Sequence, residues 1–261
     1  MSDVPLAQNK PALAPSYDLQ ALDGAPQEGA LPIFRQIAEH IARQISAGHL
    51  VPDTKLPPER AMARQYQVAV GTLRKSLAHL THIGLITRKQ GSGNYVSRTS
   101  LTSGMEASLY NFFRLELPEG GGLPSARLID FVKIRKADDL PNFGASQSAY
   151  RFRRVRYLDN LAVALEEIWL DGSCAHDIKA EDLSQSLYHY YQQELGLIIS
   201  KVEDRISLAP PPSWHRAPAD EKTSAQMGFI ERFGWSQTGK KIEYSRTWFA
   251  PERAHYTSRL R

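Results

Sequence analysis

The chain has 261 residues with a formal net charge of +4, and 42% of them are hydrophobic and 23% charged, which suits about two globular domains and excludes a small peptide scaffold. No apolar run approaches the roughly 20 residues of a membrane helix, and Met1-Ser2-Asp3 does not begin a secretory signal, so we expect a cytoplasmic protein without a membrane partner. Cys174 is the single cysteine, which excludes an internal disulfide and a thiolate zinc cluster.

The positive charge is confined to one segment. Residues 1–30 carry one Lys and four acidic residues, residues 31–98 carry ten basic and three acidic residues, and residues 99–261 carry 21 of each. Phosphate backbones attract such a segment through counterion release, so nucleic acid is the first partner to consider. A solvated basic face would have the same composition.

Two stretches interrupt the globular pattern. Residues 1–30 are rich in Ala, Pro, Gln and Gly, with too few large apolar side chains to offset chain entropy, so we expect a disordered, mobile tail. Residues 99–122 combine Ser, Thr and Gly with the run Gly120-Gly121-Gly122, which predicts a linker. The predicted domains are therefore residues 31–98 and 123–261.

The first domain begins with two helix signals. Four isoleucines recur every four residues after Pro32 and predict a helix that stops at Gly48, with one face formed by Ile33, Ile37, Ile41 and Ile45. After the extended Leu56-Pro57-Pro58, a short helix over residues 59–66 is expected to bury Ala61, Met62 and Tyr66.

A third helix and a hairpin follow. The helix is predicted over residues 69–83, with Leu73, Leu77 and Leu80 inward and Gly84 at its end. Residues 85–87 and 94–97 read as two short strands joined by a glycine-rich turn. Three helices and a hairpin make a winged helix-turn-helix.

The polar residues of this module suit a DNA duplex. In a helix-turn-helix the third helix enters the major groove, where Arg74 can donate a bidentate pair to guanine while Thr72 and Lys75 reach phosphates. Arg60 and Arg64 lie on the second helix, which crosses the sugar-phosphate strand. The flexible tip of the wing, which can reach the minor groove or its phosphates, consists of Gly91, Ser92 and Gly93.

Five ordered segments of this module resemble the GntR family of bacterial transcription regulators: PIF at 32–34, LPPER at 56–60, VAVGTLRKSL at 68–77, GLI at 84–86 and QGSGNYV at 90–96. The resemblance implies DNA contacts from Arg60, Arg74 and the Gly91 wing, and a homodimer on a two-fold symmetric, double-stranded operator. Many members carry Ser-Arg where this chain has Ala69-Val70, which removes a helix cap and a base-reading arginine. A valine there can meet a thymine methyl instead.

The second domain alternates strands with a few helices. β-rich runs bounded by turn residues occupy 129–134, 150–157, 163–170 and 242–249. Residues 183–195 carry apolar side chains at helical spacing, and residues 225–233 are expected to form another helix. The fold class is therefore α+β.

This second half narrows the resemblance. It is too β-rich for the helical, metal-associated branch of the family and too short for a fused aminotransferase, and it resembles the HutC branch with its UTRA effector domain. That domain has an antiparallel, chorismate-lyase-like sheet and binds a small ligand without turning it over. The motifs that carry this likeness are Arg154-Val155-Arg156, Asp159-Asn160, Ala164-Leu165-Glu166 and Glu243-Tyr244-Ser245, with Asn160 and Ala162 where Gly and Pro are usual.

Arg154 and Arg156 lie two apart on a strand, so they project from one face and can clamp a carboxylate, phosphate or sulfate. A tight two-residue turn at Asp159-Asn160 would place Arg153 opposite Glu166, whereas one extra residue in the turn would place Arg154 there. The family resemblance favours Arg154.

Tyr244 and Ser245, from a later strand, are expected to donate hydrogen bonds to the same ligand. The predicted effector-binding residues are Arg154, Arg156, Glu166, Tyr244 and Ser245. The alternative is a surface hairpin whose cross-strand ion pairs contribute only about 0.5 kcal/mol each.

No Ser/His/Asp arrangement, phosphate-binding glycine loop or carboxylate pair has convincing spacing, and Cys174-Ala175-His176 lacks a further metal ligand. We predict no catalytic residue, metal or cofactor. The predicted function is a ligand-responsive bacterial transcription regulator, a repressor released from DNA by a small anionic metabolite. An enzyme with a lyase-like domain acting on a small organic acid is the alternative, and a winged helix that docks protein is a third possibility.

Overall fold

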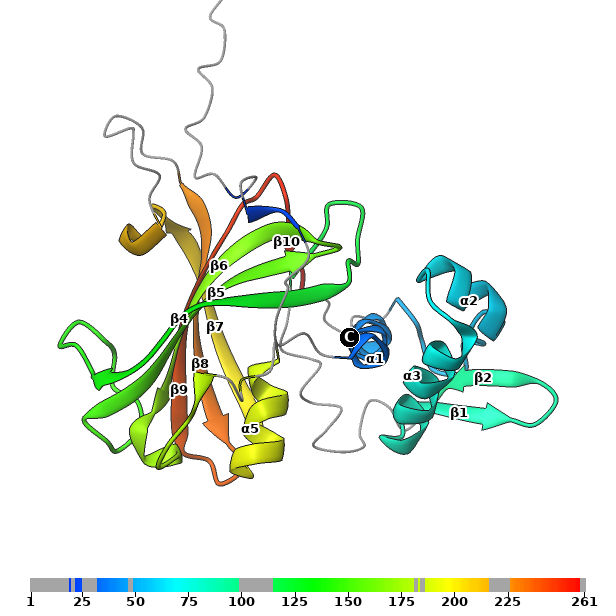
Figure 1. Cartoon of the computed structure of the whole chain (residues 1–261), viewed down its shortest axis with the longest axis horizontal. Coiled ribbons are helices and arrows are strands. Elements are labelled where there is room, and N and C mark those ends of the chain that lie inside the picture. The colour runs from blue at the N-terminus through cyan, green and yellow to red at the C-terminus, as the bar shows by residue number, and fades with distance from the viewer. Residues whose placement is uncertain are drawn as a thin grey trace, which may run out of the picture.

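The computed structural model describes residues 19, 22–24, 32–46, 49–98, 115–180, 183, 186–215 and 226–258. A small helical unit with a hairpin is followed by a larger unit built on an antiparallel sheet (Figure 1). The predicted α+β architecture, a winged helix-turn-helix before an antiparallel-sheet domain, is confirmed.

The first unit consists of α1 (Ile33–Ser46), α2 (Glu59–Gln65), α3 (Val70–His82), β1 (Ile86–Lys89) and β2 (Gly93–Val96). Ile37, Ile41 and Ile45 of α1 pack against the leucines of α3 as predicted. Ile33, the first residue of the helix, is 41% exposed and does not join this core. The predicted stop at Gly48 lies outside the described residues.

The short helix and the turns of this unit follow local chemistry. α2 buries Met62 and Ala63, whereas the predicted Ala61 and Tyr66 are only half-buried. Gly84, which follows α3, has a φ of +75°, a left-handed conformation that glycine adopts without strain. The helix therefore ends where the sequence predicts.

The second unit is a six-stranded antiparallel sheet with strand order β4-β5-β6-β9-β8-β7. Its strands are β4 (Pro124–Arg135), β5 (Ser148–Leu158), β6 (Leu161–Asp171), β7 (Ile199–Ala209), β8 (Met227–Ser236) and β9 (Lys241–Phe249). Among its described residues there are also the helix α5 (Leu187–Leu195) and two short 3-10 turns, Gly172–Cys174 and Ser213–His215. The helix predicted over residues 183–195 is confirmed over Leu187–Leu195 but begins later than predicted, because Ser186 is its N-cap.

The helix predicted over residues 225–233 is wrong, because this segment forms β8. Its aromatic side chains alternate along the strand, as in Phe229 and Phe233, and such residues favour pleated sheet. Gly228 lies under the ring of Phe249: a Cβ at this position would approach the ring to 2.1 Å. A glycine that admits a neighbouring ring is typical of a strand rather than a helix interior.

The two faces of the sheet are covered by different elements. On the inner face, defined by Phe152, Arg154 and Ile168, α5 packs through Tyr191, whose ring centroid lies 6.5 Å from that of Phe152. In Figure 1, α5 and α1 both lie on this side of the sheet. The outer face, defined by Trp169, Tyr244 and Phe233, is closed by the loop that carries Phe143.

Parts of the predicted tail and linker are packed. Leu19 is 1% exposed within the core of the sheet domain, and Asp23 accepts hydrogen bonds from the Ala162 amide at 2.8 Å and from Arg253 at 3.0 Å. The expectation of a mobile tail therefore does not hold for these residues. In the predicted linker, β3 (Leu115–Glu116) pairs with β10 (His255–Tyr256), and residues 99–114 lie outside the described part.

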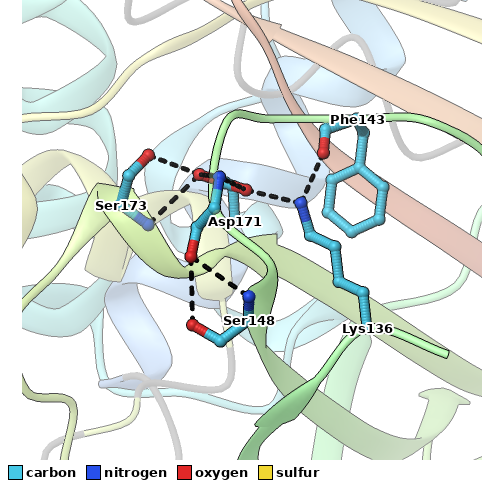
Figure 2. A network of polar contacts seen from close by, with 6 residues as sticks. Lys136, Phe143, Ser148, Asp171 and Ser173 are labelled. Atoms are coloured by element: carbon cyan, nitrogen blue, oxygen red, sulfur yellow. Dashed lines mark hydrogen bonds and ion pairs between the residues drawn. The ribbon is translucent and has the colours of Figure 1, made fainter.

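A buried carboxylate fixes the loop between β4 and β5 (Figure 2). Asp171 is 0% exposed and lies 2.5 Å from Lys136 Nζ, which also donates to the Phe143 carbonyl oxygen. The Ser173 amide donates to the same carboxylate at 3.1 Å. Gly144 passes so close that a Cβ would lie 2.0 Å from Asp171, so only glycine fits there.

The two units touch through α1. His40 Nδ1 lies 3.2 Å from the Gly122 carbonyl oxygen, and His49 Nε2 lies 3.7 Å from Glu116 Oε1. Leu123, at the start of the sheet domain, packs against the core of the helical unit. The helical unit is therefore seated on one end of the sheet, with α1 at the contact (Figure 1).

Candidate DNA-binding and effector sites

The third helix presents its polar side to solvent. The Arg74 side chain is 68% exposed, and its Nε donates a hydrogen bond of 2.7 Å to Glu59 Oε2 at the start of α2. Because this bond uses Nε, the edge formed by the two Nη groups stays available to pair with guanine. Lys75 is exposed beside it and Thr72 is half-buried, so the structure brings the three predicted residues of α3 together.

α2 and the wing add further exposed groups. Arg60 and Arg64 are four residues apart on α2 and both exposed, so they project from one side of the helix. At the wing tip Gly91 and Gly93 have φ values of +75° and +121°, and the Ser92 hydroxyl lies 2.7 Å from the hydroxyl of Tyr95. α2 and the wing both lie on the side away from the sheet (Figure 1).

The register of the hairpin formed by β5 and β6 determines which arginine stands opposite Glu166. Asp159 and Asn160 form a two-residue turn with φ values of +47° and +67°. One unmatched residue in β6, Val163, then shifts the pairing so that Arg154 stands opposite Glu166. The extra residue is present, but it is a β-bulge in the strand rather than part of the turn.

Arg154 and Arg156, the arginine pair, converge on one carboxylate. Arg154 Nη2 donates to Glu166 Oε2 at 2.6 Å, and Arg156 Nε lies 3.6 Å from Glu166 Oε1. All three side chains are buried. Burial acts to raise the pKa of Glu166, but the charges of Arg154 and Arg156 outweigh it and hold this pKa below its usual range. Two guanidinium groups thus share one carboxylate in a low-dielectric setting.

Ser245 lies on the same inner face, and Tyr244 does not. Ser245 is 7% exposed and pairs with Ile168 of the inner face. The ring of Tyr244 stacks on Trp169 of the outer face at 5.5 Å, and its hydroxyl donates to Glu231 at 2.5 Å. The prediction that Tyr244 contributes to this site is wrong, because successive residues of a strand point to opposite faces.

A second polar group on the inner face was not predicted. Arg232 of β8 forms a two-point ion pair with Asp204 of β7, at 2.6 and 2.7 Å, and stands opposite Ser245 across the strands. The signal in the sequence was the alternation of large side chains along residues 227–236, which is typical of a strand. A strand there places Arg232 on the same face as Ser245.

Glu243 is the third element of this face. It is 1% exposed, and its Oε1 accepts a hydrogen bond of 2.7 Å from the Tyr188 hydroxyl on α5. Burial raises the pKa of Glu243 to about 7, an effect that hydrogen bonding by Tyr188 and Tyr191 offsets in part. At neutral pH this carboxyl group therefore exists in both protonation states and can donate or accept a hydrogen bond.

Within the part of the chain that the structure describes, no three His, Cys, Asp or Glu side chains form a group able to hold a metal ion. Cys174 is half-buried, and burial raises the pKa of its thiol to about 11, so it is not a reactive thiolate. None of the described helices combines the length and apolarity needed to cross a membrane.

Comparisons with known proteins agree with this geometry. Residues 34–96 match "Bacterial regulatory proteins, gntR family", and residues 120–255 match the UTRA domain. The chain is 47% identical over 233 residues to the HTH-type transcriptional regulator SmoD of Agrobacterium fabrum, which covers 89% of this chain and 98% of that protein. It is 27% identical to the mannosyl-D-glycerate transport/metabolism system repressor MngR of Escherichia coli, over 88% of this chain and 96% of that one.

Among solved structures, the ligand-binding domain of a GntR-family transcriptional regulator from Bordetella bronchiseptica has the same fold, with a TM-score of 0.50 at 15% identity. It covers 57% of this chain and 98% of that chain. The relatives are regulators, so the alternative of an enzyme is excluded. The chain belongs to the GntR family of bacterial DNA-binding transcription regulators, with the UTRA effector domain of the HutC branch.

Proposed function

We propose that this regulator is a repressor that binds a two-fold symmetric operator as a homodimer in the cytoplasm and leaves it when a small anionic metabolite enters the UTRA domain. The observation that carries the effector class is the arginine pair, whose two buried guanidinium groups share Glu166. Arg232 is already matched by Asp204 in a two-point ion pair, whereas Arg154 and Arg156 bring two positive charges to the one carboxylate of Glu166.

The rest of the inner face supports a ligand that is rich in hydroxyl groups as well as anionic. Ser245 and Glu243 both lie on this face, and Glu243 there already accepts a hydrogen bond from one hydroxyl group, that of Tyr188. The name of MngR refers to the transport and metabolism of mannosyl-D-glycerate, a compound that combines a sugar with a carboxylate. A sugar acid or sugar phosphate fits both features of this face.

The DNA-binding residues proposed are those predicted on α2, on α3 and at the wing tip. In a dimer, two recognition helices must match half-sites about one helical turn apart, so operator affinity depends on how the sheet domains hold the pair. The effector would favour a dimer in which this spacing is lost. The size of the switch equals its differential affinity for the two arrangements.

The test separates the two sites. Arg74→Ala should weaken operator binding by about 10-fold to 100-fold while ligand binding is kept, because one bidentate base contact is lost. Arg156→Ala should do the reverse and leave a DNA binder that ignores its inducer. Fluorescence anisotropy with the promoter fragment, at fixed salt and with a panel of sugar phosphates and sugar acids, measures both.

The control is random duplex of the same length at the same ionic strength. If the wild-type protein binds both duplexes equally, the proposed operator function is wrong. If Arg156→Ala is released by the same compound at the same concentration as the wild type, the assignment of the effector site is wrong.

A further inference from the structure

We propose that Glu39, on the first helix of the DNA-binding domain, borders the effector site from across the domain boundary, and that it and the anionic effector compete for Arg156. This inference rests on the proposed effector site. It adds a residue of the other domain to that site and a direct route from the ligand to the DNA-binding module.

Glu39 lies on the side of α1 that faces the sheet domain. It is two residues from Ile37 and from Ile41, which point into the core of their own unit, so it points away from that core. On the same side, His40 contacts the Gly122 carbonyl oxygen, and a Cβ at Gly121 would lie 3.4 Å from the side chain of Gln44.

Glu39 is 9% exposed, which is unusual for a glutamate on the surface helix of a small module. On its own helix its carboxylate accepts a hydrogen bond of 3.0 Å from Arg43 Nη2. Beyond Arg43, the charge that acts on this carboxylate from the sheet domain is that of Arg156, itself 8% exposed.

The two charges act on each other in both directions. Burial raises the pKa of Glu39, and the charges of Arg43 and then Arg156 act against that rise. Burial also lowers the pKa of Arg156, while Glu166 and Glu39 act to raise it. The other charged groups that face this pair are Arg35 beside Glu39, and Arg154 and Arg232 beside Arg156.

An anion held by the arginine pair would therefore lie beside the Glu39 carboxylate. Two negative charges in this buried setting repel each other more strongly than they would in water. Binding of the anion and seating of α1 on the sheet are consequently antagonistic, and by linkage each weakens the other by the same factor. Ligand binding thus acts directly on the position of the DNA-binding domain.

The first experiment uses inorganic sulfate as the probe and the full chain as the protein. Glu39→Gln keeps the shape of the side chain and removes its charge, so the affinity for sulfate should rise by about tenfold. Titration calorimetry at constant ionic strength, with chloride as the balancing anion, measures this change. Glu194→Gln, an exposed glutamate on α5, is the matched control and should leave the affinity unchanged.

The second experiment needs no ligand. Glu39→Lys places a positive charge against Arg156 and should unseat α1, so small-angle X-ray scattering should show a larger radius of gyration than for the wild type. Glu39→Gln should shift the profile in the same direction by less. Circular dichroism confirms that each variant is folded, and Glu39→Asp replaces any variant that is not, with a smaller expected shift.

The outcomes separate this inference from the function on which it rests. If Glu39→Gln and Glu39→Lys leave both the sulfate affinity and the scattering profile as in the wild type, the role of Glu39 is overturned. If Arg156→Gln abolishes sulfate binding in that case, the effector site still stands. If Arg156→Gln binds sulfate as well as the wild type does, the proposed effector site fails, whatever the Glu39 variants do.

Discussion

Asp171 and Glu243 are both buried carboxyl groups of the sheet domain, but their neighbours move their pKa values in opposite directions. Burial acts to raise both values. At Asp171 the hydrogen bonds from Lys136 and Ser173 outweigh burial and lower the pKa below the usual 3.8. At Glu243 burial dominates and the pKa rises to about 7. The stability of the domain should therefore depend on pH in two separate windows.

Replacing Asp171 by Asn should lower the free energy of unfolding at neutral pH by about 3 kcal/mol, because Lys136 loses the carboxylate that balances its charge. Since the folded pKa of Asp171 lies below its unfolded value, its contribution is present above about pH 4 and is lost as the pH falls further. Urea unfolding at neutral and acid pH measures this, with Asp138→Asn, in the loop between β4 and β5, as the exposed control. An equal acid dependence in Asp171→Asn and wild type would contradict it.

Glu243 should act in the opposite sense. Its folded pKa is raised, so folding is favoured most when it is protonated, and this advantage is lost as the pH rises through about 7. Relative to Glu243→Gln, the wild type should lose about 3 kcal/mol of unfolding free energy between about pH 4.5 and pH 8. Unfolding curves at both values test this, and a constant difference between the two proteins would show that Glu243 does not titrate in this range.

At the scale of one element, α3 has no side-chain cap at its N-terminus and carries a glycine in its first turn that has free space around it. Its N-cap residue, Ala69, makes no side-chain cap hydrogen bond, in agreement with the absence of the usual serine. Gly71, in the first turn, has no atom within 4 Å of the position that a Cβ would take. Nothing within the described protein therefore requires glycine there, and a close approach of the DNA backbone would explain it.

Gly71→Ala should accordingly stabilise the protein by about 0.5 to 1 kcal/mol, since alanine is the better helix former, and should weaken operator binding. Ala78→Gly, an exposed position on the same helix, is the matched control: it should cost similar stability and leave operator affinity unchanged. Urea unfolding and anisotropy titration measure the two quantities. Unchanged operator affinity in Gly71→Ala would remove the backbone-contact explanation.

Elements whose residues show a periodicity or an end signal in the sequence were predictable, and elements whose identity depends on pairing within the sheet were not. The isoleucines of α1 and Gly84 after α3 report helix periodicity and a helix end directly, and both predictions hold. β8 was misread because its apolar spacing over a few residues suits a helix, while its strand character comes from pairing with β7 and β9.

The effector site shows the same division. The pairing of Arg154 with Glu166 was open because the sequence does not fix the length of the turn, and a bulge within β6 has the same effect on the register as the longer turn would have. Tyr244 was assigned to the site by its place in a motif. Its neighbour Ser245 lies on the inner face, however, and two successive residues of a strand cannot lie on the same face. Arg232 was missed together with its strand.

At the scale of the whole molecule, β7 is the exposed edge of the sheet. Ile206 and Leu208, two apart on one face of this strand, are 54% and 67% exposed. Among the described residues this edge has no partner strand, and exposed apolar side chains on an edge invite another chain, so the homodimer proposed above is predicted to form its contact there. The opposite edge, β4, has one such side chain, Ile129, which is 45% exposed.

Leu208→Glu should therefore convert the dimer to monomer, as measured by analytical ultracentrifugation, and should weaken operator binding by about 100-fold because the two half-sites are then bound independently. Ser207→Glu introduces the same charge on the other face of β7 and should leave the dimer intact. A Leu208→Glu protein that stays dimeric with wild-type operator affinity would move the interface away from β7.

The bulge at Val163 has a consequence for how this hairpin can vary between relatives. In a chain that gained one residue in the turn and kept the bulge, a different side chain of β6 would stand opposite Arg154 of β5. Effector binding would then be lost although every residue of the motifs was still present. Insertion at the tip and deletion of the bulge must therefore be inherited together. When homologous hairpins are aligned, a gap at the turn and a compensating gap at the position of the bulge should be treated as one evolutionary event.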